Sequence, residues 1–180
     1  MGNSTSVADI PETLVLKRHR DLIGRRHQVW IRRILLTLVG IVPLLALFNL
    51  FGQRPDVRRV DSPAAQLELY ATDTVRGGLL WEARFTITAH RELTDAVLEL
   101  DQGWLEGQTL NTIEPSPLGE GSHNGAAVFD LGHVPAGQKH VLYIQFQTNP
   151  TNVGRKHQDV RLYDGKHHLA TLDRTLTIFP

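Results

Sequence analysis

Nine histidines are the residues of this 180-residue chain best suited to binding a metal or moving a proton. Seven of them follow residue 55, and His133, His140, His167 and His168 are the candidate ligands for zinc or copper(II). His167 and His168 are neighbours, so on a strand their side chains would point to opposite faces. A shared metal would require a bulge or ligands from other strands. We therefore expect exposed or hydrogen-bonded histidines and no cofactor, with a metal-binding or enzymatic outer domain as the alternative.

Patterns that would indicate an enzyme are missing from the sequence. There is no cysteine, which excludes a disulfide framework, a thiolate metal site and a cysteine nucleophile. No Gly-x-Ser-x-Gly, Gly-x-Gly-x-x-Gly or Walker motif occurs, so neither a serine hydrolase nor a nucleotide-binding protein is favoured. The pairs Asp101 with Glu106 and Glu114 with Glu120 are more typical of solvated loops than of a glycosidase. The sequence therefore predicts a protein that is not an enzyme.

Residues 34–52 form an apolar segment without a charge. A helix of about 19 residues rises about 28 Å, close to the bilayer's hydrocarbon thickness of about 30 Å. A cleaved signal peptide would have a shorter apolar region, a shorter basic start and a small-residue cleavage site. We therefore predict an uncleaved transmembrane helix. Positions along this predicted span are Ile34, Leu38, Pro43, Leu47 and Phe51.

The segment before this predicted span is basic. Residues 1–33 contain seven basic and three acidic residues, a balance of about +4, whereas the chain from residue 55 onward carries about −5. Because basic flanks stay in the cytoplasm, we expect the N-terminus inside the plasma membrane and the C-terminal domain outside. The nearest basic residues are Arg25, Arg26, Arg32 and Arg33. The tail is expected to be partly an amphipathic helix in contact with anionic lipid.

From residue 64 onward, short runs of alternating apolar and polar residues are separated by turn residues, which is typical of antiparallel strands. The clearest run is 80–89. Similar runs occupy 65–71, 95–100, 109–113, 126–131, 140–147, 159–163 and 166–171, and a last strand is expected at 175–179. We predict that 64–180 form an antiparallel β-sandwich of seven or eight strands, joined to the span by a link at 53–63. The acidic balance of this domain argues against nucleic acid as a partner.

The stretch 128–137 reads Val-Phe-Asp-Leu-Gly-His-Val-Pro-Ala-Gly and precedes an expected strand. It resembles the Pro-x-Gly turn and strand of immunoglobulin-like modules in bacterial membrane-anchored extracytoplasmic proteins. The resemblance covers the region from about residue 63 onward, implies a fold, and implies no catalytic residue or specific family.

A long turn-rich segment, 103–125, is the candidate surface for a protein partner. Trp104 and Leu105 stand at its start, and Trp104 is expected either to contact a partner or to cap the core. Gly40 and Ala46 form no small-x-x-x-small pair, so the span does not favour helix pairing. We therefore predict a non-enzymatic accessory subunit of a membrane or envelope complex, with bilayer and protein partners.

Overall fold

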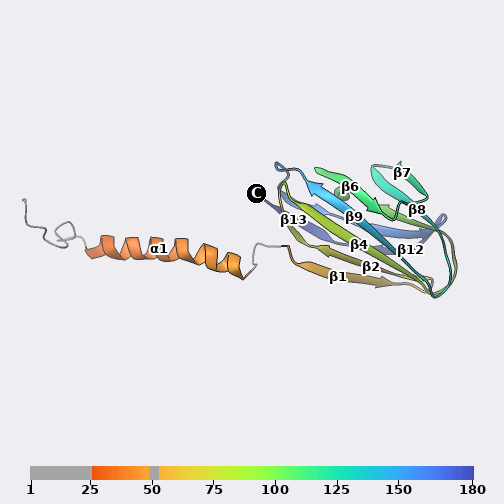
Figure 1. Cartoon of the computed structure of the whole chain (residues 1–180), viewed down its shortest axis with the longest axis horizontal. Helices are drawn as coiled ribbons and strands as arrows, with labels where there is room; N and C mark the ends of the chain where they lie inside the picture. Colours follow the sequence, from red (N-terminus) through yellow and green to blue (C-terminus); the bar gives the residue numbers. More distant parts are fainter. Residues whose placement is uncertain (1–25, 49–52) are drawn as a thin grey trace, which may run out of the picture. The chain divides into compact units, whose positions relative to one another are not determined.

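The computed structural model describes residues 26–48 and 53–180 (Figure 1). These residues belong to two separate compact units, one within residues 1–50 and the other within residues 51–180. The first unit contains helix α1, Arg26–Leu47, with Pro43 inside it. It begins eight residues before the predicted span because Arg, Trp and Gln are compatible with a helix and residues 26–33 contain no Gly or Pro. The predicted positions Arg25 and Phe51 lie outside the described residues.

Helix α1 exposes its apolar side chains along its whole length. Among the described residues, 27–47 form the one helix that is long and apolar enough to cross a membrane, and none of it is buried. Leu38 is 59% exposed and Leu47 is 88% exposed. A helix that is apolar on most sides and lacks protein around it is suited to lipid.

The described part of the second unit consists of thirteen β-strands in three sheets. The first sheet has the order β1 (Pro55–Asp61), β2 (Ala65–Thr72), β4 (Leu80–Ala89), β9 (Lys139–Thr148) and β6 (Gln108–Glu114). The second has the order β12 (His167–Leu172), β11 (Val160–Asp164), β5 (Leu93–Leu100), β8 (Ala126–Val134) and β7 (Gly119–His123). A small third sheet has the order β10 (Gly154–His157), β13 (Thr175–Phe179) and β3 (Thr74–Arg76). All pairs are antiparallel except β13 with β3.

The strands form where residues alternate between a buried and an outward side chain. In β4 the residues Trp81, Ala83, Phe85 and Ile87 are buried, and the residues between them face outward. β11 follows the same rule, because Val160 and Leu162 are buried and the residues between and after them are not. Buried residues from all three sheets belong to one hydrophobic core.

The strand count exceeds the predicted seven or eight, and the link predicted at 53–63 is wrong over most of its length. Residues 55–61 form β1, which pairs with β2 over seven positions. Its polar composition hid it, because β1 lies at a sheet edge and carries charges that find partners on the sheet. Arg59, for example, contacts Glu68 at 2.6 Å. The short strands β3, β7 and β10 were also absent from the prediction, because three to five residues are too few for alternation to be visible.

Four aromatic rings form the centre of the core. Trp104 is fully buried, and its ring centre lies 5.9 Å from Trp81, 5.4 Å from Phe85 and 5.4 Å from Phe146. It sits in a short 3₁₀ helix, Gln102–Trp104, whose first turn is capped by the Asp101 carboxylate. The Trp104 Nε1–H donates to the Asp159 carbonyl at 3.1 Å, so the one polar atom of the indole is satisfied.

Replacing Trp104 with alanine should therefore open a cavity at the centre of the domain. We expect Trp104→Ala to lower the free energy of unfolding by about 3–5 kcal/mol. Guanidinium unfolding of the full chain in detergent, followed by circular dichroism, measures the change. Leu118→Ala is the control, because Leu118 is 77% exposed. Equal effects of the two substitutions would contradict this account of the core.

Candidate functional site

The outward face of the second sheet carries a groove lined by both polar and apolar side chains. Because inward residues of β5 and β11 fill the core, Glu99, Arg161 and Tyr163 project from the opposite face. One hollow of about 360 Å³ is lined by Glu99, Asp101, Gln102, His123, Asn124, Ala126, Arg161 and Tyr163. A second hollow of about 460 Å³ is lined by Val97, Glu99, His123, Val128, Tyr163, Gly165 and Lys166. The two share Glu99, His123 and Tyr163, and we call them together the outer-face groove.

An ion pair crosses the floor of the outer-face groove. Arg161 and Glu99 are opposite each other in the β11–β5 register, and Arg161 Nη1 lies 2.6 Å from Glu99 Oε1. The hydrogen bond to Glu99 raises the pKa of Arg161. The Glu99 side chain is only 14% exposed, so the pair is better shielded from water than an ordinary surface ion pair.

At one end of the groove, partial burial raises the pKa of the Asp101 carboxyl. Hydrogen bonding opposes this shift, because Asp101 Oδ1 accepts from the Gly103 N–H at 3.1 Å. Beside the groove, the rings of Tyr163 and His168 meet edge to face at 5.3 Å. The groove therefore offers both charges, amide groups, an aromatic ring and the apolar side chains of Val97 and Val128, which suits recognition of a partner surface of mixed polarity.

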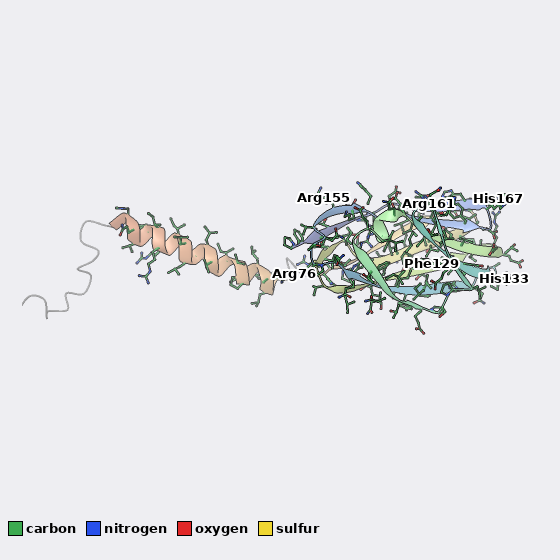
Figure 2. All side chains as sticks on the ribbon, turned by 90° about the horizontal axis from the view of Figure 1, so that it is seen from above. Arg76, Phe129, His133, Arg155, Arg161 and His167 are labelled. Carbon is green, nitrogen blue, oxygen red and sulfur yellow. The ribbon has the colours of Figure 1, made fainter. Side chains whose placement is uncertain are left out.

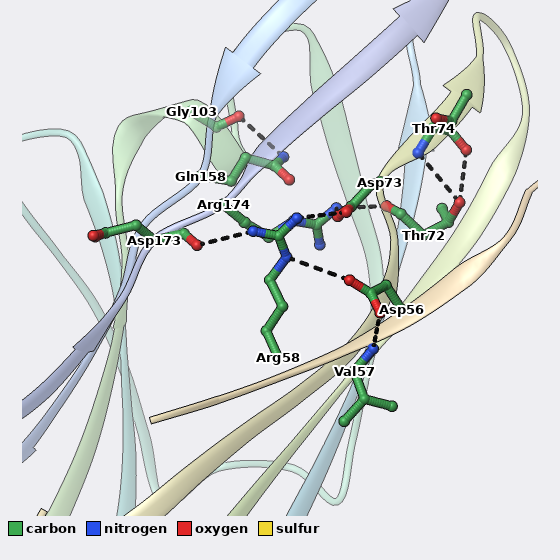
Figure 3. Close-up of polar contacts among 10 residues, drawn as sticks. All are labelled: Asp56, Val57, Arg58, Thr72, Asp73, Thr74, Gly103, Gln158, Asp173 and Arg174. Atoms are coloured by element: carbon green, nitrogen blue, oxygen red, sulfur yellow. Dashed lines mark hydrogen bonds and ion pairs between the residues drawn. The ribbon is translucent and has the colours of Figure 1, made fainter. Parts of the chain in front are cut away.

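A third hollow, of about 290 Å³, lies beside a buried arginine. Its walls come from Arg58, His157, Asp159, Asp173, Arg174 and Thr175. The Arg174 side chain is 1% exposed, and burial lowers the pKa of its guanidinium to about 10, which still leaves it charged near neutral pH. Asp73 opposes this shift. Asp73 lies 3.6 Å from Arg174 Nη2 and 2.6 Å from Arg58 Nη2 (Figure 3).

The surroundings of Arg174 give it a structural role. Its Nη2 donates to the Thr72 carbonyl, and its guanidinium carbon lies 5.5 Å from the Trp81 ring centre and 5.1 Å from that of Trp104. The Nε and Nη1 atoms are buried without a hydrogen-bond partner. The cation–π contact with these two indole rings stabilises the cation directly. Asp159 and Asp173 on the wall oppose an anion in this hollow, so its geometry does not indicate an anion site.

The four candidate histidines lie on three different strands. His133 is on β8, where its Nε2 lies 2.9 Å from Glu92 Oε1, and His140 is on β9. His167 and His168 begin β12, and His168 Nε2 lies 2.7 Å from Thr171 Oγ1. Figure 2 shows His133 and His167 at the same end of the domain. In residues 26–48 and 53–180, no three His, Asp or Glu residues come together as a metal-binding group.

The structure places Trp104 and Leu105 against the core. Trp104 is fully buried and Leu105 is partly buried, so the second of the two expectations for Trp104, a cap on the core, describes its position. A partner contact in the segment 103–125 would have to involve other residues. His123 and Asn124, which line the outer-face groove, belong to that segment.

No protein-family model matches the chain, and no curated protein sequence matches it. A cohesin from the archaeon Archaeoglobus fulgidus matches at 14% identity and a TM-score of 0.41, over 61% of this chain and 88% of that one. A Clostridium acetobutylicum protein, CaCohA2, matches at 14% and 0.43, over 59% and 86%. A CARDB domain from Pyrococcus furiosus, in complex with di-metal ions, matches at 13% and 0.35, over 71% and 96%. These neighbours are immunoglobulin-like folds, and at TM-scores below 0.5 they assign no family or activity to this chain.

Sequence reasoning missed the groove residues and Arg174, although a signal for each was present. Arg174 lies an even number of residues from the buried Leu172, Leu176 and Ile178. In an extended chain this spacing puts its side chain on the same, inward side. Arg161 lies between the buried Val160 and Leu162, so its side chain faces outward. The pairing of β5 with β11 spans about sixty residues of sequence, and alternation alone does not reveal which strands are neighbours.

The half-buried His140 should make folding sensitive to acid. Burial lowers the pKa of His140, and its Nε2 has no hydrogen-bond partner. The unfolded chain therefore binds a proton at His140 more readily than the folded chain, and stability is lost as the pH falls below the unfolded pKa of about 6.5. We expect His140→Gln to reduce the loss of stability between about pH 7.5 and about pH 5.5.

Chemical unfolding of wild type and variant at each pH measures this difference. Lys139→Gln is the control, since it changes the exposed neighbour on β9 and keeps the histidine. It should retain the wild-type slope of stability against pH. If stability depended on pH with the same slope in wild type and His140→Gln, His140 would not be a source of the acid sensitivity.

Proposed function

We propose that this protein is a single-pass plasma-membrane protein with an extracytoplasmic, immunoglobulin-like β-sandwich domain. The observation that carries the proposal is helix α1, which is long enough to span a bilayer and has apolar side chains that no protein surface covers in the described residues. The helix acts as an uncleaved signal anchor. Arg26, Arg32 and Arg33 lie in its N-terminal half and, with the tail before them, hold the N-terminus in the cytoplasm beside anionic lipid.

The β domain serves as the binding part of a non-enzymatic accessory subunit. The outer-face groove is the surface for a protein partner in the membrane or envelope. Its Arg161–Glu99 pair and the Tyr163 ring support this choice, because a fixed ion pair and a rigid aromatic side chain give orientation as well as contact area. Strands β5, β8 and β11 hold these groups on a sheet rather than on a loop, so they are pre-organised for binding.

Site-specific crosslinking tests the use of this groove. A photoreactive phenylalanine analogue in place of Tyr163 in the full chain should crosslink in cells to one protein in a stable ratio. The matched control is Tyr143, another tyrosine, which is 38% exposed and lies on β9 in the first sheet. The same analogue at position 143 should not capture that protein.

Charge reversal gives a second measurement on the same surface. Arg161→Glu places two carboxylates side by side in the groove and should lower the crosslinking yield at position 163 by about tenfold, which corresponds to about 1.4 kcal/mol. Arg91→Glu changes the same charge at an exposed position outside the groove and should preserve the yield. Equal yields at positions 163 and 143 would contradict docking at the groove.

A further inference from the structure

Exposed apolar side chains gather at one end of the β domain. Leu79, Leu80, Val153 and Phe179 are 46%, 50%, 51% and 45% exposed. Scattered single apolar residues are ordinary on a protein surface, but a group of large ones at one place indicates contact with an apolar or interfacial environment. We call this part of the domain the entry end, because the chain enters the domain beside it.

Hydrogen bonds and strand register bring the four residues together. The Gln53 side chain donates to the Leu80 carbonyl at 3.2 Å, which fixes the start of the domain beside Leu80. The Gly77 N–H donates to the Phe179 carbonyl at 2.7 Å. In the β10–β13 ladder Gly154 is opposite Ile178, so the next position of the register sets Val153 beside Phe179.

Basic side chains border these apolar residues. Arg76 and Arg155 are both exposed, and Figure 2 shows them at the same end of the domain. Arg76 Nε donates to the Pro180 carbonyl at 3.1 Å, which leaves the rest of its guanidinium for other partners. The nearby acid Glu106 is paired with Lys156 at 2.7 Å. Apolar residues bordered by arginines match the chemistry of a bilayer surface, where anionic headgroups cover apolar acyl chains.

Chain connectivity limits how far the entry end can lie from a membrane that α1 crosses. Residues 48–54 join the two units, and seven extended residues reach about 25 Å at most. The opposite end of the domain is a full strand away, about 33 Å for the ten residues of β4. That opposite end includes the turn at Ala136, where the Gly137 N–H donates to the Ala89 carbonyl at 2.8 Å.

We propose that the entry end rests on the bilayer surface. Leu79, Leu80, Val153 and Phe179 enter the headgroup layer, and Arg76 and Arg155 pair with anionic lipid phosphates. A lipid surface is favoured over a protein as the occupant because the short connection keeps this end near the membrane whatever else is bound. The inference rests on the proposed anchoring by α1, and it leaves the outer-face groove free for a partner.

Labels at single cysteines test the proposal in the full chain, since the natural sequence has none. Val153→Cys, Ala136→Cys and Thr37→Cys each receive an environment-sensitive nitrobenzoxadiazole fluorophore. The purified proteins are reconstituted into vesicles of three parts phosphatidylcholine to one part phosphatidylglycerol. Spin-labelled lipids then quench any fluorophore that touches the bilayer. All three positions are exposed, so the labels avoid the core.

We expect quenching at position 153 to exceed that at position 136 by at least about twofold, and to fall when phosphatidylglycerol is omitted. Strong quenching at position 37 shows that α1 is in the bilayer. Quenching at 37 with equal, weak quenching at 153 and 136 would overturn the surface contact and leave the anchor intact. Weak quenching at 37 would instead overturn the proposed anchoring. Quenching at 153 that ignores phosphatidylglycerol would overturn the pairing of the arginines with anionic lipid.

Discussion

Helix α1 has to be covered by something other than water or the described protein. Its apolar side chains are exposed over more than five turns, and burying each fully would release about 1.5–3 kcal/mol. A bilayer supplies that burial but offers no hydrogen bonds to backbone groups. A helix meets this condition, because its backbone N–H and C=O groups bond to one another. Pro43 is compatible with this environment, because neighbouring groups and local adjustment accommodate the lost hydrogen bond. The division into two compact units is consistent with the proposed arrangement, in which lipid solvates the helix and water solvates the β domain.

Within the β domain, one cation holds several elements together. Arg174 precedes β13, stacks on Trp81 of β4 and on Trp104 of the 3₁₀ helix, and donates to Thr72 at the end of β2. Asp73 links it to Arg58 of β1. The same contacts make burial of a charge tolerable, because the guanidinium lies over two neighbouring indole rings and one edge meets a carbonyl and a carboxylate. The outer-face groove lies on strands whose inward residues pack into this core, so the rigidity of the core fixes the groove.

Residue pattern predicted some parts of this structure and left others hidden for physical reasons. The strand at 80–89 was recovered with its bounds unchanged, because both faces of β4 are well defined by alternation. The apolar helix was also predicted, although α1 begins earlier than the span. β1 was missed because Arg58 and Arg59 are neutralised by Asp73 and Glu68, which are close only after folding. The groove is likewise a product of strand order, and Trp104 was undecided because composition does not show which side of a loop is covered.

The central proposal is that α1 crosses a membrane and that the β domain after it lies outside the cytoplasm. A reporter enzyme that works only outside the cytoplasm, fused after Pro180 of the full chain, measures this directly. The account predicts an active fusion at this position and an inactive one when the same reporter is placed before Met1. An inactive fusion after Pro180, with full-length protein present in the membrane fraction, would contradict the proposed topology.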